Sequence, residues 1–428
     1  MSQLSDMHIT EQRSLDAVPN SPDRNKPLGF ILRLAKALHT YGLPAYELEQ
    51  TINGCAEAMG YGVQCMSLPT SISLTIFPPD DEPKTYLIRV SPGEVNIERL
   101  RKTTQVARHV INGDLDSQQG ADRLKEIAAD GQDYPNWVIA LAFSIVSTCI
   151  ARIFSGGLNE MAISAVIGLI VGLIAIASKT RPMLDHLLPA ICAFIATSIA
   201  LSMDRLFGVT ITTSVVVISG LIILLPGLSL TIALAELATQ NLVSGTARLS
   251  GTVTVFIQLA FGSALAAEIA SRLGLQASHA AVNPVEFWTI WLAAAIAALA
   301  LVPLFSARKQ DSGWFLLAAL SAFTMVYFAS KALGPSLGAF AGAITVGLMA
   351  KLVTRFFDIP GAMIMMPGFI ILVPGTVGYR SILALVEKDV VAGLSTAFEV
   401  ALIGISLVAG FLLSSLVPLP KDDAKDHY

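Results

Sequence analysis

Long stretches without a charged side chain dominate the last two thirds of this 428-residue chain. Ten stretches contain no Lys, Arg, Asp or Glu: Trp137–Ala151, Met161–Ser178, Leu187–Met203, Leu206–Ala235, Leu249–Ala267, Phe287–Ala307, Ser312–Ser330, Ala332–Ala350, Ile359–Tyr379 and Val400–Pro420. A membrane-spanning helix needs about 20 apolar residues. Only 14% of all residues are charged, against roughly 25% in soluble domains. The sequence therefore predicts ten transmembrane helices. We expect Trp137 to anchor the first helix and Arg152 to snorkel at its end.

A Pro-Gly pair interrupts two of these stretches at corresponding places. Pro226-Gly227 and Pro374-Gly375 each follow four apolar residues and lie 148 residues apart (374 − 226 = 148). The same spacing carries Gly245 onto Gly393. Ten spans divide into five plus five at this spacing, and an odd number of spans places the second copy in the opposite orientation. Inverted repeats with broken helices are typical of secondary transporters, whose binding sites lie at the breaks.

A more polar segment precedes the first span, and its hydrophobic period changes along the chain. Helical spacing is expected at Leu28–Tyr41, from Pro44 onward, and in two polar helices at Asn96–Ile111 and Ser117–Ala129. Between Val63 and Val90 apolar residues alternate with polar ones, which predicts strands, and Pro78–Asp81 is typical of a turn between two of them. This segment is therefore predicted to be a small α/β domain.

These patterns predict a mostly α-helical membrane protein of ten transmembrane helices, arranged as two five-helix inverted repeats, with a small N-terminal α/β cytoplasmic domain. The expected parts are a disordered tail (1–26), the cytoplasmic domain (27–133), the first repeat (134–274), the second repeat (284–420) and a polar tail (421–428). Lys and Arg in the short loops place the N-terminal domain in the cytoplasm, with the inner membrane of a bacterium as the default location. A net charge of −4 gives no sign of nucleic-acid binding.

Two ionisable residues follow the first Pro-Gly pair. Glu236 is a candidate to bind an ammonium group or to carry a proton, and Arg248 is a candidate to bind a carboxylate. They flank Gly245, and breaking the helix at Pro226-Gly227 exposes backbone amides that favour a carboxylate. The alternative is that both residues are anchors at the cytoplasmic interface. The substrate-binding set is therefore Pro226, Gly227, Glu236, Gly245, Arg248, Pro374 and Gly375.

The second repeat carries Arg380 just after its Pro-Gly pair and Glu399 inside its last apolar stretch. Because a buried carboxylate holds its proton more tightly, Glu399 would suit proton coupling or gating. Its alternative role is a structural partner for Arg380 or another basic residue, and Arg380 alone is typical of an interfacial charge.

Catalysis is the competing interpretation of the N-terminal domain. His39, Cys55 and Cys65 could form a thiol nucleophile with a base, but no spacing brings them together and no strained nucleophile turn is present. The four cysteines have no metal-ligand spacing. We expect no enzyme activity, no metal and no cofactor.

Several short motifs in combination resemble the threonine/serine exporter family. They are Tyr41–Glu49, Leu68–Ser71, Gly93–Asn96, Leu225-Pro226-Gly227 with Ser244-Gly245-x-x-Arg248, and Leu372–Gly375. The resemblance covers Lys26 to Pro420, with the two membrane modules fused in one chain. It implies export of small hydroxy amino acids across the inner membrane, driven by the proton motive force. The family has Asp near the position of Glu236, which is one methylene longer.

The leading hypothesis is thus a secondary exporter of threonine and serine, with protons and the lipid bilayer as its other partners and a homo-oligomer as a compatible state. A dicarboxylate exporter of succinate-like substrates is the first alternative, and it should depend more on Arg248 and Arg380 than on Glu236. A membrane-anchored hydrolase and a ligand sensor are weaker alternatives, since ten spans exceed what an anchor needs.

Overall fold

The computed structural model describes residues 26–79, 82–91, 95–131, 134–209, 211–275, 285–357, 361, 364–365, 368, 375–386 and 389–417, with only the backbone at 204–207 and 357. These residues divide into two compact units. Residues 26–131 and 235–248 form the head unit, and the remainder of the described chain forms the membrane unit. The expected tails, apart from Lys26, lie outside the described residues, as do the turn residues 80–81 and Pro374.

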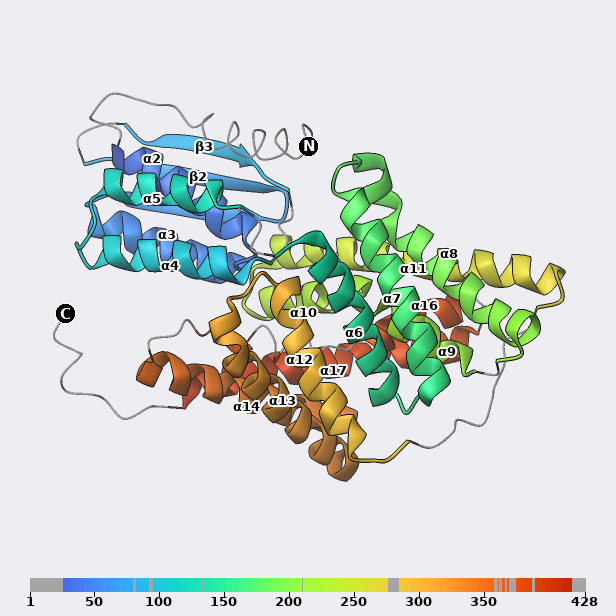
Figure 1. The fold of residues 1–428 in the computed structure, drawn as a ribbon. Coiled ribbons are helices and arrows are strands. Elements are labelled where there is room, and N and C mark those ends of the chain that lie inside the picture. Colours follow the sequence, from blue (N-terminus) through green and yellow to red (C-terminus); the bar gives the residue numbers. More distant parts are fainter. Residues whose placement is uncertain are drawn as a thin grey trace. The chain divides into compact units, whose positions relative to one another are not determined.

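The head unit contains four helices and a three-stranded antiparallel sheet of order β1-β2-β3 (Figure 1). Its elements are α2 (Lys26–Thr40), α3 (Ala45–Ala58), β1 (Gly62–Leu68), β2 (Ser71–Phe77), β3 (Lys84–Arg89), α4 (Ile97–Ile111) and α5 (Ser117–Ala129). The register pairs Cys65 with Leu74 and Leu74 with Tyr86. The predicted helices and strands of the α/β domain are confirmed.

Sequence periodicity explains the packing of the head unit. Ile72, Leu74 and Ile76 alternate with less buried neighbours on the central strand β2, so one face of the sheet is buried. Asn96 caps α4 by accepting a hydrogen bond from the Arg99 N–H at 2.9 Å. The result is a domain with its own hydrophobic core.

The secondary-structure elements of the described membrane unit are helices joined by short turns. They are α6 (Asn136–Ile153), α7 (Leu158–Ser178), α8 (Pro182–Phe207), α9 (Thr213–Leu221), the 3₁₀ turn η2 (Ile222–Leu224), α10 (Gly227–Ala238), α11 (Leu242–Arg272), α12 (Thr289–Leu304), the 3₁₀ turn η3 (Lys309–Asp311), α13 (Ser312–Leu333), α14 (Pro335–Phe357), α16 (Gly375–Val386) and α17 (Val390–Leu416). The last residues of α10 and the first of α11 belong to the head unit.

Among the described residues, seven helices are long and apolar enough to cross a membrane, or eight if the bent pair around Pro226 is one span. The helix Thr289–Leu304 is apolar but shorter. The predicted span Ile359–Tyr379 lies largely outside the described residues. The prediction of ten spans in two inverted repeats therefore remains a prediction, while the mostly helical membrane architecture with a small sheet is confirmed.

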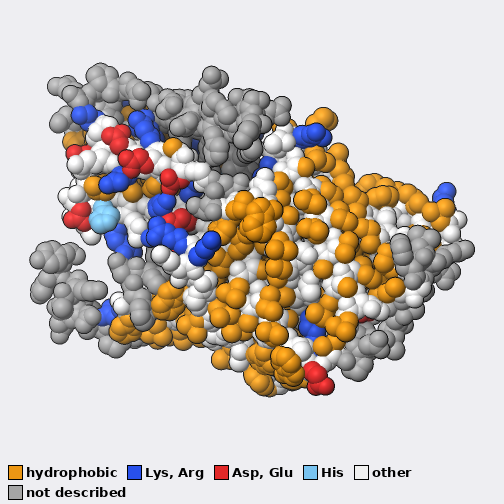
Figure 2. Space-filling view, viewed as in Figure 1, with side chains coloured by type: hydrophobic (Ala, Val, Ile, Leu, Met, Phe, Trp, Pro, Cys, Tyr) orange, Lys and Arg blue, Asp and Glu red, His pale blue; other side chains and the backbone are white. Residues whose placement is uncertain are grey.

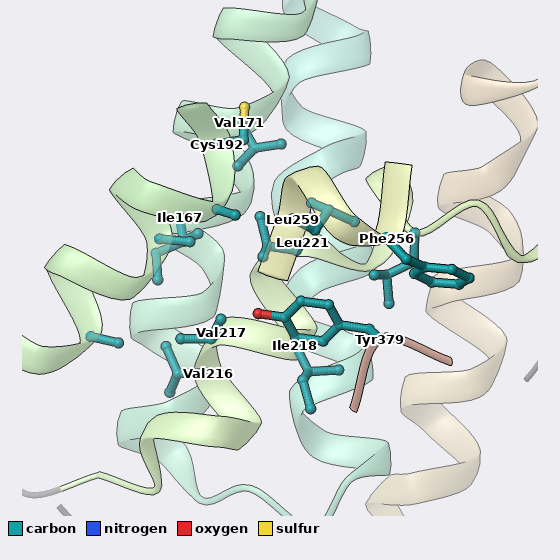
Figure 3. Close-up of a cluster of buried hydrophobic side chains, with 14 of the residues drawn as sticks. Ile167, Val171, Cys192, Val216, Val217, Ile218, Leu221, Phe256, Leu259 and Tyr379 are labelled. Carbon is teal, nitrogen blue, oxygen red and sulfur yellow. The ribbon is translucent and has the colours of Figure 1, made fainter. Parts of the chain in front are cut away.

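An extensive core of the membrane unit lies where α7, α8, α9, α11 and α16 converge (Figure 3). Val171, Cys192, Val217 and Leu259 are among its buried side chains, and the ring of Tyr379 joins them. Apolar side chains also cover the outer surface of the membrane unit in the view of Figure 2, as expected for helices that face lipid.

The expectation that Arg152 snorkels toward water is wrong. Its side chain is 5% exposed and donates hydrogen bonds to the Thr289 hydroxyl at 2.6 Å and to the Val285 and Glu286 carbonyls at 3.1 Å each. A buried guanidinium needs such acceptors, because an unpaired buried charge is costly. Arg152 thus ties the end of α6 to the start of α12.

Candidate functional site

The first Pro-Gly pair breaks a helix, as predicted. The axes of Thr213–Leu224 and Gly227–Ala238 differ by 61°. Proline has no N–H and its ring blocks the preceding turn, so α9 tightens into η2 and ends. The Pro226 carbonyl accepts from the Leu230 N–H at 3.0 Å and so starts α10. The break is therefore a helix end followed directly by a new helix N-terminus.

Gly375, from the second Pro-Gly pair, lies beside Gly227 of the first. A Cβ atom placed on Gly375 would lie 3.3 Å from the Cα atom of Gly227 and 3.5 Å from its backbone nitrogen. Gly227 and Gly375 are the first residues of α10 and α16. Two helix N-termini, separated by 148 residues in the chain (375 − 227 = 148), therefore meet inside the membrane unit.

Close contacts on other helices follow the same spacing. A Cβ on Gly262 of α11 would collide with the Ala190 carbonyl of α8, and a Cβ on Gly410 of α17 with the Phe340 carbonyl of α14, where 410 − 262 = 148. Cross-contacts also pair: α16 approaches α11 at Gly378, and α17 approaches α10 at Gly404. Small residues at matched places let equivalent helices approach equally closely.

The head unit holds the two ionisable residues that the sequence singled out, and it brings them together. Glu236 is fully buried, while the Arg248 side chain is 21% exposed. One Glu236 oxygen accepts from Ser244 Oγ at 2.9 Å and from Arg248 Nε at 3.2 Å. The other accepts from Arg248 Nη2 at 3.2 Å and from the backbone N–H of Ala45 at 3.3 Å. Ala45 is the first residue of α3, whose N-terminus favours a carboxylate.

Around this ion pair the head contributes polar groups that the sequence did not assign to this site. His39 Nε2 lies 3.2 Å from the Pro69 carbonyl, and because a carbonyl only accepts, this nitrogen carries the proton. His39 Nδ1 lies 3.4 Å from the Ser67 hydroxyl. The Ser67 N–H donates to Glu49 at 2.9 Å. These residues come from α2, β1 and α3, so their proximity depends on the fold.

Burial controls the protonation of these groups. Burial lowers the pKa of His39 below its usual value, the bond to the Pro69 carbonyl opposes this, and the nearby Arg248 charge adds to it. Burial raises the pKa of Glu47, against the opposing hydrogen bond from Tyr46. It also raises the pKa of Glu49, where the Ser67 N–H opposes and the Glu236 charge reinforces the shift. The cluster therefore favours a neutral His39.

The remaining candidates are spread over the molecule. Gly245 is buried near the start of α11. Arg380 is exposed on α16 and Glu399 is half-buried on α17. Within the part of the chain that the structure describes, no hydrogen bond or ion pair joins Arg380 to Glu399.

The thiol hypothesis gains no support from the geometry. Burial raises the pKa of Cys55 and of Cys65 to about 12, and the Cys55 thiol donates to the Ala107 carbonyl. His39 is committed to Pro69 and Ser67 rather than to a thiol. A thiol held protonated is a poor nucleophile.

The fold and the apolar helices define a multi-pass membrane protein with a small α/β head. Two family models match it in succession: "Putative threonine/serine exporter" over residues 29–270 and "Threonine/Serine exporter, ThrE" over residues 291–417. The chain therefore belongs to the threonine/serine exporter family, in a form that fuses both modules.

The curated relatives include fungal membrane proteins. An uncharacterized protein of Schizosaccharomyces pombe is 22% identical over 87% of this chain and 45% of its own length. Pheromone-regulated membrane protein 10 of Eremothecium gossypii is 23% identical over 83% of this chain and 49% of its own length, and that of Candida albicans is 24% identical over 87% and 34%. The chain thus spans between about a third and a half of these relatives. No solved structure matches the chain.

Proposed function

We propose that this protein is a secondary active exporter that moves threonine and serine from the cytoplasm across the inner membrane, driven by the proton motive force. Membership of an exporter family supports transport in general. The observation that carries the proposal is the approach of Gly227 to Gly375, where α10 and α16 begin side by side. Helix N-termini of this kind point at anionic substrate groups in transporters.

Inverted repeats are part of this proposal. The helices that follow α10 and α16 also begin at the same spacing, α11 at Leu242 and α17 at Val390 (390 − 242 = 148). An approximate two-fold axis would bring equivalent residues together where it passes, as Gly227 and Gly375 do. Alternating access would then follow from one repeat moving against the other around the breaks.

The Glu236–Arg248 ion pair supports a zwitterionic substrate. A buried carboxylate and a guanidinium neutralise each other, so the pair is complementary to a molecule that carries both charges. An amino acid could replace each partner with its own ammonium and carboxylate without leaving a charge unpaired. A dicarboxylate would satisfy Arg248 but would leave Glu236 buried without a cation, so the pair favours the amino acid.

Proton coupling is assigned to Glu399. This carboxylate is half-buried on the last helix of the second repeat. Protonation and release there would couple the proton gradient to movement of α17.

The test is excretion by cells fed threonine-containing peptides, with and without this protein, and with succinate-loaded cells in parallel. The proposal expects faster threonine and serine excretion only when the protein is present. No change in either amino acid, together with faster succinate excretion, would replace it with the dicarboxylate alternative.

A further inference from the structure

Three serine hydroxyls in the membrane unit are buried without a hydrogen-bonding partner among the residues that the structure describes. They belong to Ser147 on α6, Ser164 on α7 and Ser219 on α9, each at most 1% exposed. These three helices pack against one another. Most buried hydroxyls in native proteins are hydrogen-bonded, so three unpartnered ones on neighbouring helices call for a physical reason.

Other hydroxyls on α6 show that hydrogen-bond acceptors are within reach of this helix. Ser144 Oγ donates to the Ala165 carbonyl of α7 at 2.8 Å, and Thr148 Oγ1 donates to the Ser144 carbonyl of its own helix at 2.8 Å. A hydroxyl in a helix can commonly be satisfied by the second, local type of bond. Ser147 lies between these two residues in the chain and makes neither type of bond with the described residues.

Two of the unpartnered hydroxyls surround one glycine where α6 meets α7. A Cβ atom on Gly168 of α7 would lie 2.4 Å from Ser147 Oγ, so the Ser147 hydroxyl points at this glycine. Ser164 lies four residues before Gly168, which is one turn along the same face of α7. A glycine at this place lets the two helices approach closely without interlocking side chains.

The third hydroxyl lies at the same level of α7 but comes from α9. The Thr212 N–H at the start of α9 donates to Glu160 Oε1 at the start of α7 at 2.9 Å. Further along, a Cβ on Gly220 would lie 2.4 Å from Ile167 Cγ2. These contacts join residues 52 and 53 positions apart (212 − 160 = 52; 220 − 167 = 53), so α7 and α9 run parallel in a constant register. Ser219 directly precedes Gly220 and is therefore level with the glycine of α7 that the α6 hydroxyl contacts.

We propose that α9 separates from α6 and α7 during the transport cycle, and that Ser147, Ser164 and Ser219 then line a water-filled path for the polar substrate. The inference goes beyond the proposed function, because it names residues along the path and depends on transport but not on which amino acid is carried. α9 leads through η2 directly into the break at Pro226, so its displacement changes the geometry of the break. This movement inside the first repeat accompanies the motion of one repeat against the other.

The three hydroxyls lower the free-energy cost of this separation. In the packed state each hydroxyl has lost water without gaining a protein partner, whereas in the separated state water can bond all three. The apolar neighbours act in the opposite sense, since Ile167 and Val217 belong to the buried core that holds the helices together (Figure 3). A charged substrate also needs a wet path, because an apolar passage would leave its charges unsolvated. The packed state is therefore stable but poised to open.

The first experiment removes the hydroxyls one at a time, in Ser147→Ala, Ser164→Ala and Ser219→Ala. Ser144→Ala is the matched control on α6, because its hydroxyl is bonded. The Tm of the solubilised protein and threonine efflux from dipeptide-loaded cells are measured, with efflux normalised to the amount of protein in the membrane. Each of the three variants should raise the Tm by about 2 °C, since an unfavourable group leaves the packed state. Each should also slow efflux about fivefold, since opening then gains less hydration, whereas Ser144→Ala should lower the Tm.

The second experiment tests whether water reaches the path. Ser219→Cys should react with a membrane-impermeant maleimide above the background of the unaltered protein, and faster while threonine is exported, because the reactive thiolate forms only in contact with water. Ser263→Cys is the control and should stay at background, since Ser263 is equally buried but its hydroxyl bonds Thr197 and Tyr379.

An unchanged or lower Tm in the three alanine variants would mean that their hydroxyls are bonded in the folded protein, for example by trapped water, and would overturn the proposal. Labelling of Ser219→Cys no greater than background would overturn it as well. If the unaltered protein exports neither threonine nor serine, the proposed function fails, whereas raised Tm values together with labelling of Ser219→Cys would still support the path.

Discussion

Removing the two partners of the buried ion pair should have unequal effects on the head. Glu236 is fully buried and depends on Arg248 for its only described cationic partner, whereas Arg248 retains 21% exposure of its side chain. Arg248→Ala therefore leaves a buried carboxylate without a cation. Glu236→Gln keeps an oxygen that can accept from Ala45 or Ser244, and it leaves a guanidinium that reaches water.

The structure sets the expected magnitudes. Taking the cation from a buried pair costs about 3–5 kcal/mol. The neutral glutamine introduced by Glu236→Gln loses charge-assisted bonds but leaves no buried charge, so its cost should be about 1–3 kcal/mol. A double variant, Glu236→Gln with Arg248→Ala, should cost less than the sum of the two, because neither member is then left unpaired.

Hydrogen exchange of the first amides of α3 measures these costs. The Ala45 N–H bonds Glu236, and its exchange rate reports the free energy of local opening. Both single variants should also insert normally and lose threonine export, since each removes a proposed substrate ligand. The Ala45 amide should lose more protection from exchange in Arg248→Ala than in Glu236→Gln. Equal protection in the two variants, or a greater loss in Glu236→Gln, would refute the argument that the buried Glu236 depends on Arg248. Normal threonine export by both single variants would mean that the Glu236–Arg248 pair has only a structural role.

Three further predictions concern coupling, pH and packing. Glu399→Gln should remove the dependence of export on external pH in efflux assays, and unchanged dependence would take Glu399 out of the mechanism. Burial lowers the pKa of His39 below 6.5 in the folded head, so as the pH falls below about 6.5 the unfolded state binds a proton before the folded state does, and the head loses stability. In denaturant titrations, the difference in unfolding free energy between the unaltered protein and His39→Gln should therefore narrow over that range. A constant difference would contradict this prediction. Gly262→Ala places a Cβ against the Ala190 carbonyl and should lower the Tm of the solubilised protein, whereas Gly251→Ala on the same helix meets nothing within 4 Å and should not; equal Tm values would refute the close contact.

Local patterns were sufficient to predict the head. The alternation of Ile72, Leu74 and Ile76 and the proline before α3 act over a few residues, so the strands and helices could be assigned without knowledge of their partners. The break at Pro226 was equally predictable, because proline disrupts a helix wherever it occurs in its interior.

Contacts that depend on the fold could not be predicted in the same way. Glu236 and Arg248 meet because the chain reverses between α10 and α11 at Gln240, whose φ is 66°, and no periodicity reveals that turn. From the sequence alone, Arg152 is typical of a charge that reaches water at the end of a membrane helix. Only the fold shows that the start of α12 buries it. His39, Glu49 and Ser67 come together from three elements, and Tyr379, Ser263 and Thr197 from three helices, so only the tertiary structure connects them.

Efflux from proteoliposomes that contain only this protein tests the central claim most directly. Vesicles are loaded with radiolabelled threonine, serine or succinate, and release is followed with and without a pH gradient. The account predicts release of threonine and serine that the gradient accelerates, with little release of succinate. Release of succinate alone, or release of none of the three by correctly inserted protein, would contradict it.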